Sequence, residues 1–346
     1  MDNNNGRRNR PAYRSRKLLA YRIGRALSIV VLIAGVLMLI LYFEKTTDFL
    51  HRNEQAGHRI DAPDKNRPVT EWNGSSFVLR DDLETTLVAG VDSFAAEASP
   101  EETGEFHQCD FLYLIVENKT DKTYSTIHIN RDTMTTVDVL TSNGKKVRDD
   151  EMQIALSFAY GGSFPAQCRN MIKAVRGLLF DIEIDHYVVV TMDSVPVMNN
   201  AVGGVTLEIM DDIDEMKKGE VMTLNGDQAL RYVRARLEVA DNPTNERRME
   251  RQSQYISEFS KVFRAKANED SSFSLRMINE IGDYLKSDCT AKQLADLSNK
   301  TATYEQTGAH KLAGESALGS KFMQFRADPD KLKELYVSVF CEKIGK

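Results

Sequence analysis

TLVAGV at residues 86–91 and FLYLIV at residues 111–116 are two short apolar runs, and each has an aspartate at one end. Runs of this length and composition are typical of buried β-strands. Residues 124–129 alternate apolar and polar side chains, which predicts a third strand. These three segments predict a β-sheet in the first half of the chain.

Helical patterns dominate the remainder of the chain and alternate with two further strands. We therefore expect an α/β fold in which helices cover a central sheet. The predicted helices are 151–160, 165–180, 194–202, 227–234 and 245–266, and the predicted strands are 186–191 and 205–210. The last segment, 268–346, predicts three or four more helices, which we interpret as a helical C-terminal extension.

The N-terminal region has the composition of a membrane anchor. Residues 26–43, ALSIVVLIAGVLMLILYF, contain no charged side chain, and with the preceding turn they are long enough to cross a bilayer as a helix. Residues 1–25 carry eight Lys/Arg and one acid, which by the positive-inside rule places the N-terminus in the cytoplasm. We expect a cytoplasmic tail over 1–22, a single-pass transmembrane signal anchor over 23–43, a spacer over 44–76 and an extracellular body.

Two alternatives for this region are less favoured. A cleaved signal peptide would need a small-x-small site, and residues 44–47, EKTT, offer none. Nucleic-acid binding by the tail is unnecessary, because membrane topology already explains the basic charge. The remainder of the chain holds 37 basic and 50 acidic residues, a net charge of −13, and we expect no nucleic-acid partner.

Composition and motifs exclude several function classes. The 346 residues are 42% hydrophobic and 28% charged, which is typical of a globular protein. The sequence lacks GxSxG, HExxH, P-loop and GxGxxG motifs, so a serine hydrolase or a zinc hydrolase is not indicated. The four cysteines leave the pairing open: Cys289 with Cys341, Cys109 with Cys168, or four free thiols.

Two aspartates lie at the ends of adjacent predicted strands. Asp92 directly follows the first strand and Asp110 directly precedes the second, so that the two carboxylates can meet across the joining loop. Paired carboxylate oxygens suit a hard cation such as Mg²⁺. The alternative is that each aspartate ends a strand and faces water.

Arginines are concentrated in three places of this acidic body. Guanidinium groups bind phosphate oxygens in pairs and keep their charge, so this concentration favours an anionic ligand. The alternative is a solvated helix face with Glu246 and Glu250 as ion-pair partners. The six arginines are Arg131, Arg234, Arg236, Arg247, Arg248 and Arg251.

Several segments, read in order, resemble the LytR–CpsA–Psr family. They are GVDS (90–93), CD (109–110), NRDT (130–133), YGG (160–162), IDHY (184–187), VGGV (202–205), LNGDQALRYVRAR (224–236) and RMERQ (248–252). The resemblance covers roughly residues 83–265 and implies a catalytic domain over 77–267. It also implies a central mixed β-sheet flanked by helices, an apolar pocket for a lipid tail, and a location at the bacterial cell membrane.

The resemblance also implies a glycopolymer phosphotransferase. Such an enzyme moves a polymer from a polyprenyl pyrophosphate carrier to a peptidoglycan hydroxyl and forms a phosphodiester. Asp92 and Asp110 would hold Mg²⁺. The catalytic residues would be Asp132, Arg131 and Asp92, with Asp132 or Asp92 as general base. The pyrophosphate would contact Arg131, Arg234, Arg236, Arg248, Arg251 and Gln252.

Three places depart from the family pattern, and two other functions stay open. One is the segment DNPTN (241–245), which stands where the family has an acidic residue, a glycine and an arginine before the second basic motif. Asn130 stands where the family has a proline, and Gln153 stands where it has a lysine. The alternatives are a hydrolase acting on the same pyrophosphate, and a protein that binds a polyprenyl phosphate or pyrophosphate without turnover. The apolar stripe that includes Phe158, Met171 and Val175 is assigned to the core rather than to a lipid pocket.

Overall fold

The computed structural model describes residues 68–94, 107–235, 245–319 and 321–344. These residues belong to one compact unit, Lys65–Lys346. No helix within the described ranges is long and apolar enough to cross a membrane. The predicted tail (1–22), the predicted anchor (23–43) and most of the predicted spacer lie outside the described residues.

A six-stranded mixed sheet forms the centre of the fold, in the order β11-β8-β3-β4-β5-β12. Strands β3–β4, β4–β5 and β11–β8 pair antiparallel, whereas β3–β8 and β12–β5 pair parallel. The four central strands were predicted from the sequence, and the mixed sheet implied by the resemblance is confirmed. The strands are β3 (Leu83–Val91), β4 (Cys109–Asn118), β5 (Thr123–Ile129), β8 (His186–Thr191), β11 (Leu285–Ser287) and β12 (Glu305–Lys311).

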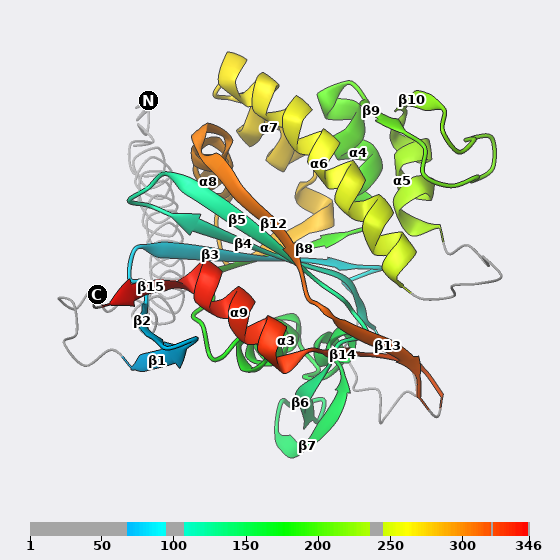
Figure 1. Cartoon of the computed structure of the whole chain (residues 1–346). Helices are drawn as coiled ribbons and strands as arrows, with labels where there is room; N and C mark the ends of the chain where they lie inside the picture. Colours follow the sequence, from blue (N-terminus) through cyan, green and yellow to red (C-terminus); the bar gives the residue numbers. More distant parts are fainter. Residues whose placement is uncertain (1–67, 95–106, 236–244, 320, 345–346) are drawn as a thin grey trace, which may run out of the picture. The chain divides into compact units, whose positions relative to one another are not determined.

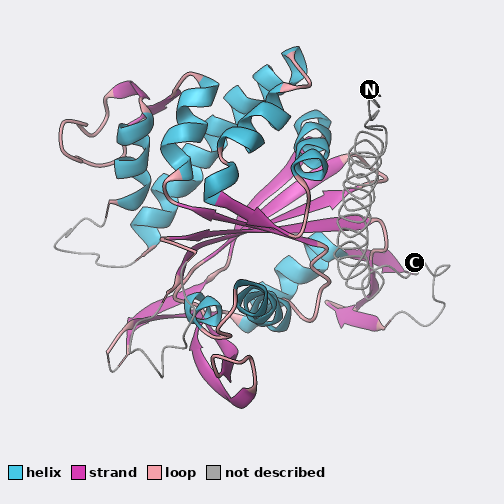
Figure 2. Ribbon diagram, turned by 180° about the vertical axis from the view of Figure 1, so that it is seen from behind, coloured by secondary structure: helices cyan, strands magenta, loops and turns pink. Residues whose placement is uncertain are grey.

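Helices cover both faces of this sheet (Figures 1 and 2). Successive side chains of a strand point to opposite faces, and the two faces are packed differently. Leu87 and Leu114 are fully buried in the main core with Met171 of α3 (Phe164–Leu178) and Phe340 of α9 (Pro329–Phe340). The stripe assigned to the core, Phe158, Met171, Val175, Leu178 and Leu179, is indeed buried there.

Four other helices cover the opposite face of the sheet. These are α4 (Ser194–Val202), α6 (Glu246–Glu269), α7 (Phe273–Glu280) and α8 (Ala291–Thr303). A second core joins α4 and α6 with α5 (Gly226–Arg234) and the hairpin of β9 (Val205–Glu208) and β10 (Val221–Leu224). Helix α5 begins at a capping box in which Asn225 and Gln228 bond reciprocally to each other's backbone N–H groups.

The predicted helical extension over 268–346 is wrong. This segment holds α7, α8 and α9, but also the edge strands β11 and β12 of the central sheet, the hairpin of β13 (Gly314–Leu318) and β14 (Met323–Ala327), and β15 (Cys341–Ile344). The strand β12 has the sequence EQTGAHK and is mostly exposed. An edge strand held by backbone bonds needs no apolar alternation, so the pattern gave no signal.

Two other boundaries differ from prediction. The segment predicted as a helix over 151–160 is the end of β7 (Lys146–Gln153), which pairs with β6 (Met134–Leu140), followed by the 3₁₀ helix η1 (Ile154–Ala159). The last residues of the predicted spacer form β1 (Val69–Trp72) and the start of β2 (Ser75–Leu79). Strand β15 pairs with β2, so the folded unit begins before residue 77 and closes on its own C-terminal strand.

All four cysteines are free thiols, so neither of the two predicted disulfide pairings forms. Cys109 and Cys168 are buried in the main core. Burial raises the pKa of the Cys109 thiol to about 12, and the pKa of Cys168 is also raised to about 12 by burial. Both groups are therefore protonated packing residues at neutral pH rather than nucleophiles.

Candidate active site

The two predicted metal-binding aspartates lie together where β3 ends and β4 begins. The pairing of the strands shifts register between Gly90 and Val91, which pair with Phe111 and Cys109. Asp110 is therefore the extra residue of a β-bulge, a feature that re-aims a side chain at the end of a ladder. Asp92 follows Val91 directly, and its side chain is 66% exposed.

Arg131 follows β5 and brings its guanidinium to Asp110. Its Nη1 forms an ion pair with Asp110 and its Nη2 donates to Gln108, while its Nε lies 3.6 Å from Asp132 Oδ1. The side chain is only 11% exposed. A guanidinium held by three neighbours is fixed in direction, as recognition of phosphate oxygens requires.

Asn130, the position where the family has a proline, still shapes this turn. Its side-chain Oδ1 accepts hydrogen bonds from the backbone N of Asp132 at 3.0 Å and from Asn245 Nδ2 at 3.1 Å. Its carbonyl accepts from the backbone N of Thr133 at 3.0 Å. An asparagine turn of this type fixes the backbone by side-chain bonding, so the substitution leaves Arg131 and Asp132 in an ordered loop.

Gln153, the position where the family has a lysine, contacts Asp132 directly. Its Nε2 donates to Asp132 Oδ1 at 2.8 Å and to the carbonyl of Met323 at 2.7 Å. The neutral amide therefore keeps a donor on Asp132 and ties the site to β14, but it adds no positive charge.

Arg234 is the last residue of α5 and reaches across to Asp92. Its Nη2 lies 3.3 Å from Asp92 Oδ1, and its side chain is 50% exposed. Two separate groups of contacts therefore lie near the paired ends of β3 and β4: Asp92 with Arg234, and Asp110 with Arg131, which also approaches Asp132. Arg236 lies outside the described residues.

Two of the three predicted contacts in the second basic motif, Arg251 and Gln252, bond to carbonyl groups at the end of α5. Arg251 is 1% exposed, and it donates to Asp211 Oδ2 at 2.8 Å, to the Tyr232 carbonyl at 3.2 Å and to the Ala235 carbonyl. Gln252 Nε2 donates to the Val233 carbonyl at 3.2 Å. The last carbonyls of a helix lack partners within it, so these side chains hold the end of α5.

Arg248 and Arg247 occupy different places on the same helix. Arg248 is 8% exposed, and its charge adds to burial, the larger effect, in lowering the pKa of His128 to about 4. Arg247, which is outside the quoted family motif, pairs with Asp211 at 2.9 Å and Glu250 at 2.8 Å. Arg247 and Arg251 are therefore held by carboxylates of this chain, and one of these, Glu250, is a partner that the alternative interpretation of the sequence named.

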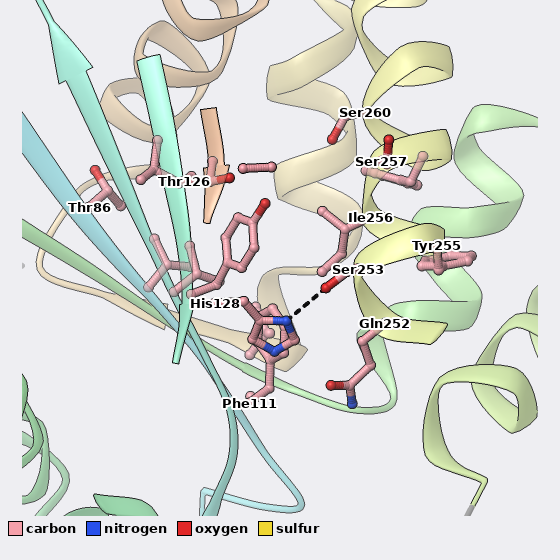
Figure 3. A pocket seen from close by; sticks show the side chains of 18 of the residues that line it. Thr86, Phe111, Thr126, His128, Gln252, Ser253, Tyr255, Ile256, Ser257 and Ser260 are labelled. Carbon is pink, nitrogen blue, oxygen red and sulfur yellow. Dashed lines mark hydrogen bonds between the residues drawn. The ribbon is translucent and has the colours of Figure 1, made fainter. Parts of the chain in front are cut away.

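A cavity of about 1180 Å³ lies between the central sheet and its helical roof. Its floor is the sheet face opposite to the main core and includes Val88, Tyr113 and Ile115, and its roof includes Ile256 and Phe259 of α6. His128 Nδ1 lies 3.0 Å from Ser253 Oγ across this space, and Figure 3 marks this hydrogen bond with a dashed line. Because its pKa is low, His128 is neutral at neutral pH, and the pair adds a hydrogen bond without a charge.

The cavity begins beside the candidate active site. Its lining includes Asn130, Gly90 and Gln252, which adjoin Arg131, the end of β3 and the end of α5. From there it follows β3 back to Thr86. Arginines beside one end of an apolar cavity are suited to a ligand with an anionic head and a long apolar tail.

The resemblance implied an apolar pocket, but sequence reasoning did not locate its lining, and it missed several contacts. Gln108 and Asp211, which bond to Arg131, Arg247 and Arg251, were not singled out in the sequence, and neither lies in a quoted motif. The sequence did hold one signal for the cavity. Val88, Tyr113 and Ile115 alternate with the core residues of β3 and β4, so these apolar side chains lie on the second face of the sheet, where another apolar group must cover them.

Residues 46–335 match the model of the LytR_cpsA_psr family. A polyisoprenyl-teichoic acid–peptidoglycan teichoic acid transferase, TagU of Bacillus subtilis (strain 168), is 26% identical over 257 residues, 72% of this chain and 75% of that protein. TagU of Halalkalibacterium halodurans is 30% identical over 154 residues, 43% of this chain and 44% of that relative. The chain thus matches less than half the length of the second relative.

Solved structures share the fold. The structure of B. subtilis TagV is similar with a TM-score of 0.59 and 19% identity, covering 75% of this chain and 97% of that one. TagT bound to LI-WTA is similar with a TM-score of 0.56 and 19% identity, covering 81% and 98%. The resemblance inferred from the sequence motifs is confirmed, and the expected class of enzyme, a transferase, is that of the named relatives.

Proposed function

This chain belongs to the LytR_cpsA_psr family, and on that premise we propose that it transfers a glycopolymer from a polyprenyl pyrophosphate carrier to a peptidoglycan hydroxyl. The observation that carries the proposal is that the Asp92–Arg234 and Asp110–Arg131 pairs adjoin an apolar cavity of about 1180 Å³, because their chain neighbours Gly90, Asn130 and Val233 line it. The cavity would take the prenyl chain, and the charged cluster would take the pyrophosphate.

Arg131 and Arg234 would each bind a different phosphate of the pyrophosphate. Arg131 is rigid and 11% exposed, whereas Arg234 is 50% exposed at the end of a helix. We assign Arg131 to a fixed contact with one phosphate. Arg234 would contact the other phosphate after it leaves Asp92, its present ion-pair partner. Fixed donors aimed at developing charge are the main source of rate enhancement in phosphoryl transfer.

The reaction exchanges one P–O bond for another. The acceptor hydroxyl attacks the phosphorus next to the glycan, the P–O bond to the lipid phosphate breaks, and polyprenyl phosphate leaves. The hydroxyl proton passes to a carboxylate. Asp132 accepts a hydrogen bond from Gln153 and Asp110 pairs with Arg131, so Asp92, at 66% exposed, is the most open carboxylate of the cluster.

Asp92 and Asp110 are the residues that would hold Mg²⁺. Their donor set fits a hard cation, because it consists of carboxylates from adjoining strand ends and the bulge turns Asp110 toward that end. When bound, the ion would neutralise charge on the pyrophosphate.

The membrane topology follows from the proposed substrate. We propose that residues 23–43 anchor the chain in the bacterial cell membrane, with the tail cytoplasmic and the folded unit extracellular. A tether of this kind raises the effective concentration of the folded unit near a lipid-linked donor.

The test compares site variants of the full-length chain in detergent. The substrates are a polyprenyl-pyrophosphate oligosaccharide and peptidoglycan fragments, assayed with Mg²⁺ and with chelator. Arg131→Ala and Arg234→Ala should each lower transfer by about 100-fold or more, the size reported for loss of one transition-state donor. Arg276→Ala is the control, because Arg276 is an exposed arginine of α7 paired only with groups of its own segment, at 2.7 Å from Asp270.

The outcome also separates the other functions. Release of free phosphorylated glycan, lost in the same variants, would assign the site to a hydrolase. Binding of the lipid without either product would assign it to a binding protein. Transfer at the wild-type rate in Arg131→Ala would contradict the assignment of the site.

A further inference from the structure

A second cluster of polar side chains lies at the opposite end of β8 from the candidate active site. His186 is the first residue of β8, and Asp288 and Cys289 lie in the loop between β11 and α8. His186 Nδ1 is 3.2 Å from Cys289 Sγ and 3.6 Å from Asp288 Oδ2. One potential ligand atom of each of the three residues lies within 4.8 Å of the others.

The loop is built so that these atoms converge. Asp288 Oδ1 accepts a hydrogen bond from the backbone N of Tyr187 at 2.9 Å, which leaves Oδ2 facing the imidazole. Ser287 Oγ donates to the Tyr187 carbonyl at 2.5 Å and accepts from the backbone N of Cys289 at 3.0 Å. Backbone bonds to β8 therefore fix the two loop side chains against His186.

A carboxylate behind the imidazole completes the arrangement. His186 Nε2 lies 3.6 Å from Glu84 Oε1, and Glu84 is held in turn by an ion pair with Lys300 of α8. A carboxylate on the far nitrogen is the usual outer partner of a metal-binding histidine, because it orients the ring and selects the tautomer. Here that partner leaves Nδ1 directed at the thiol and at Asp288.

From this geometry we propose that His186, Asp288 and Cys289 bind a thiophilic divalent cation, for which Zn²⁺ is the best fit. One sulfur, one imidazole nitrogen and one carboxylate oxygen are the three ligand types that Zn²⁺ takes in proteins, and a water would complete the tetrahedron. Binding displaces the thiol proton of Cys289 and any proton on His186 Nδ1 to solvent, so that the ligands are a thiolate and a neutral imidazole.

This site is distinct from the proposed Mg²⁺ site in place and in chemistry. Glu84 and Asp92 lie near the two ends of the same strand, roughly 26 Å apart for eight residues of extended chain. The sulfur and nitrogen donors disfavour Mg²⁺, which prefers oxygen ligands only.

The bound ion would fasten the C-terminal segment to the central sheet. Asp288 and Cys289 directly precede α8, whose residues Leu294, Leu297 and Thr301 line the cavity. The ion would join this loop to β8 and so fix one end of the helix that closes the cavity.

The experiment is a Co²⁺ titration of the full-length chain in detergent, after treatment with chelator and with a reductant that contains no thiol. Cobalt replaces Zn²⁺ in such sites, and a thiolate ligand gives a charge-transfer absorption band that a carboxylate or imidazole does not. We expect the band to saturate at about one equivalent and to disappear on addition of Zn²⁺. The matched control is Cys341→Ser, which removes the other half-exposed thiol and should leave the band unchanged.

Three variants test the ligand set. Cys289→Ser should abolish the band, Asp288→Asn should weaken Co²⁺ binding, and Glu84→Gln should weaken it by about 10–100-fold. The same titration followed by thermal unfolding should show that Zn²⁺ raises the midpoint of the wild-type chain and of Cys341→Ser. Absence of the band in the wild-type chain, or a band that survives Cys289→Ser, would overturn the proposal and leave the cluster as a hydrogen-bonded Cys–His–carboxylate group.

Discussion

Arg251→Met distinguishes a positioning role for this arginine from the pyrophosphate contact that the family motif implies. The guanidinium is 1% exposed and donates to Asp211, to the Tyr232 carbonyl and to the Ala235 carbonyl. Methionine fills most of the volume but supplies none of the donors.

The expected cost follows from the three acceptors. Each carbonyl left without a partner in a buried place costs about 1–3 kcal/mol. Asp211 still pairs with Arg247 at 2.9 Å in the variant, so losing Arg251 costs less free energy than leaving this carboxylate without any cation. We expect the free energy of unfolding to fall by about 2–6 kcal/mol, the sum for two carbonyls left without a partner.

The assay is urea unfolding of the full-length chain in detergent, with Arg276→Met as the control. Arg276 is 56% exposed and pairs with Asp270, so its replacement should cost less than about 1 kcal/mol. The reasoning would be refuted if Arg251→Met kept the stability of the wild-type chain but lost affinity for a polyprenyl pyrophosphate, because Arg251 would then be a ligand contact.

Three further predictions concern the candidate site and its cavity. The pKa of His128 is lowered to about 4, mainly by burial, so the unfolded chain binds one more proton than the folded chain between pH 6.5 and 4. The free energy of unfolding should therefore decrease by on the order of 3 kcal/mol as the pH is lowered through that range. His128→Gln should flatten this part of the stability profile. Gln153→Lys places a positive charge beside Asp132, where Gln153 Nε2 now donates at 2.8 Å. It should tighten binding of a polyprenyl pyrophosphate by about 5–10-fold in equilibrium dialysis. An unchanged affinity would count against a phosphate near this position. Ser260→Phe adds a ring to the cavity lining and should weaken binding of long prenyl chains by at least about 10-fold while leaving the affinity for short chains unchanged. The control is Lys261→Phe on the exposed side of the same helix, where the side chain is 66% exposed; it should change the affinity for neither long nor short chains.

The central strands were predictable because their side chains alternate or run apolar for a full strand. Leu87 and Leu114 mark the buried face directly in the sequence. The edge strands β11 and β12 were not predictable, because a strand at the edge of a sheet is specified by backbone pairing and carries few buried side chains.

The site was predictable in its residue types and only partly in its geometry. Asp92 pairs with Arg234, and Asp110 pairs with Arg131, near the adjoining ends of β3 and β4, but their roles stay predictions. The sequence cannot show whether an arginine on an amphipathic helix faces a ligand or the interior, and Arg251 faces the interior. That difference depends on where α5 ends relative to α6, which is a property of packing rather than of spacing.

The measurement that tests the central claim most directly is the mass of the peptidoglycan fragment after reaction with the wild-type chain, Mg²⁺ and a polyprenyl-pyrophosphate oligosaccharide. The proposal predicts a fragment that gains the glycan together with one phosphate, and an equal amount of released polyprenyl phosphate. An unmodified fragment beside free phosphorylated glycan, or beside intact lipid-linked donor, would contradict it.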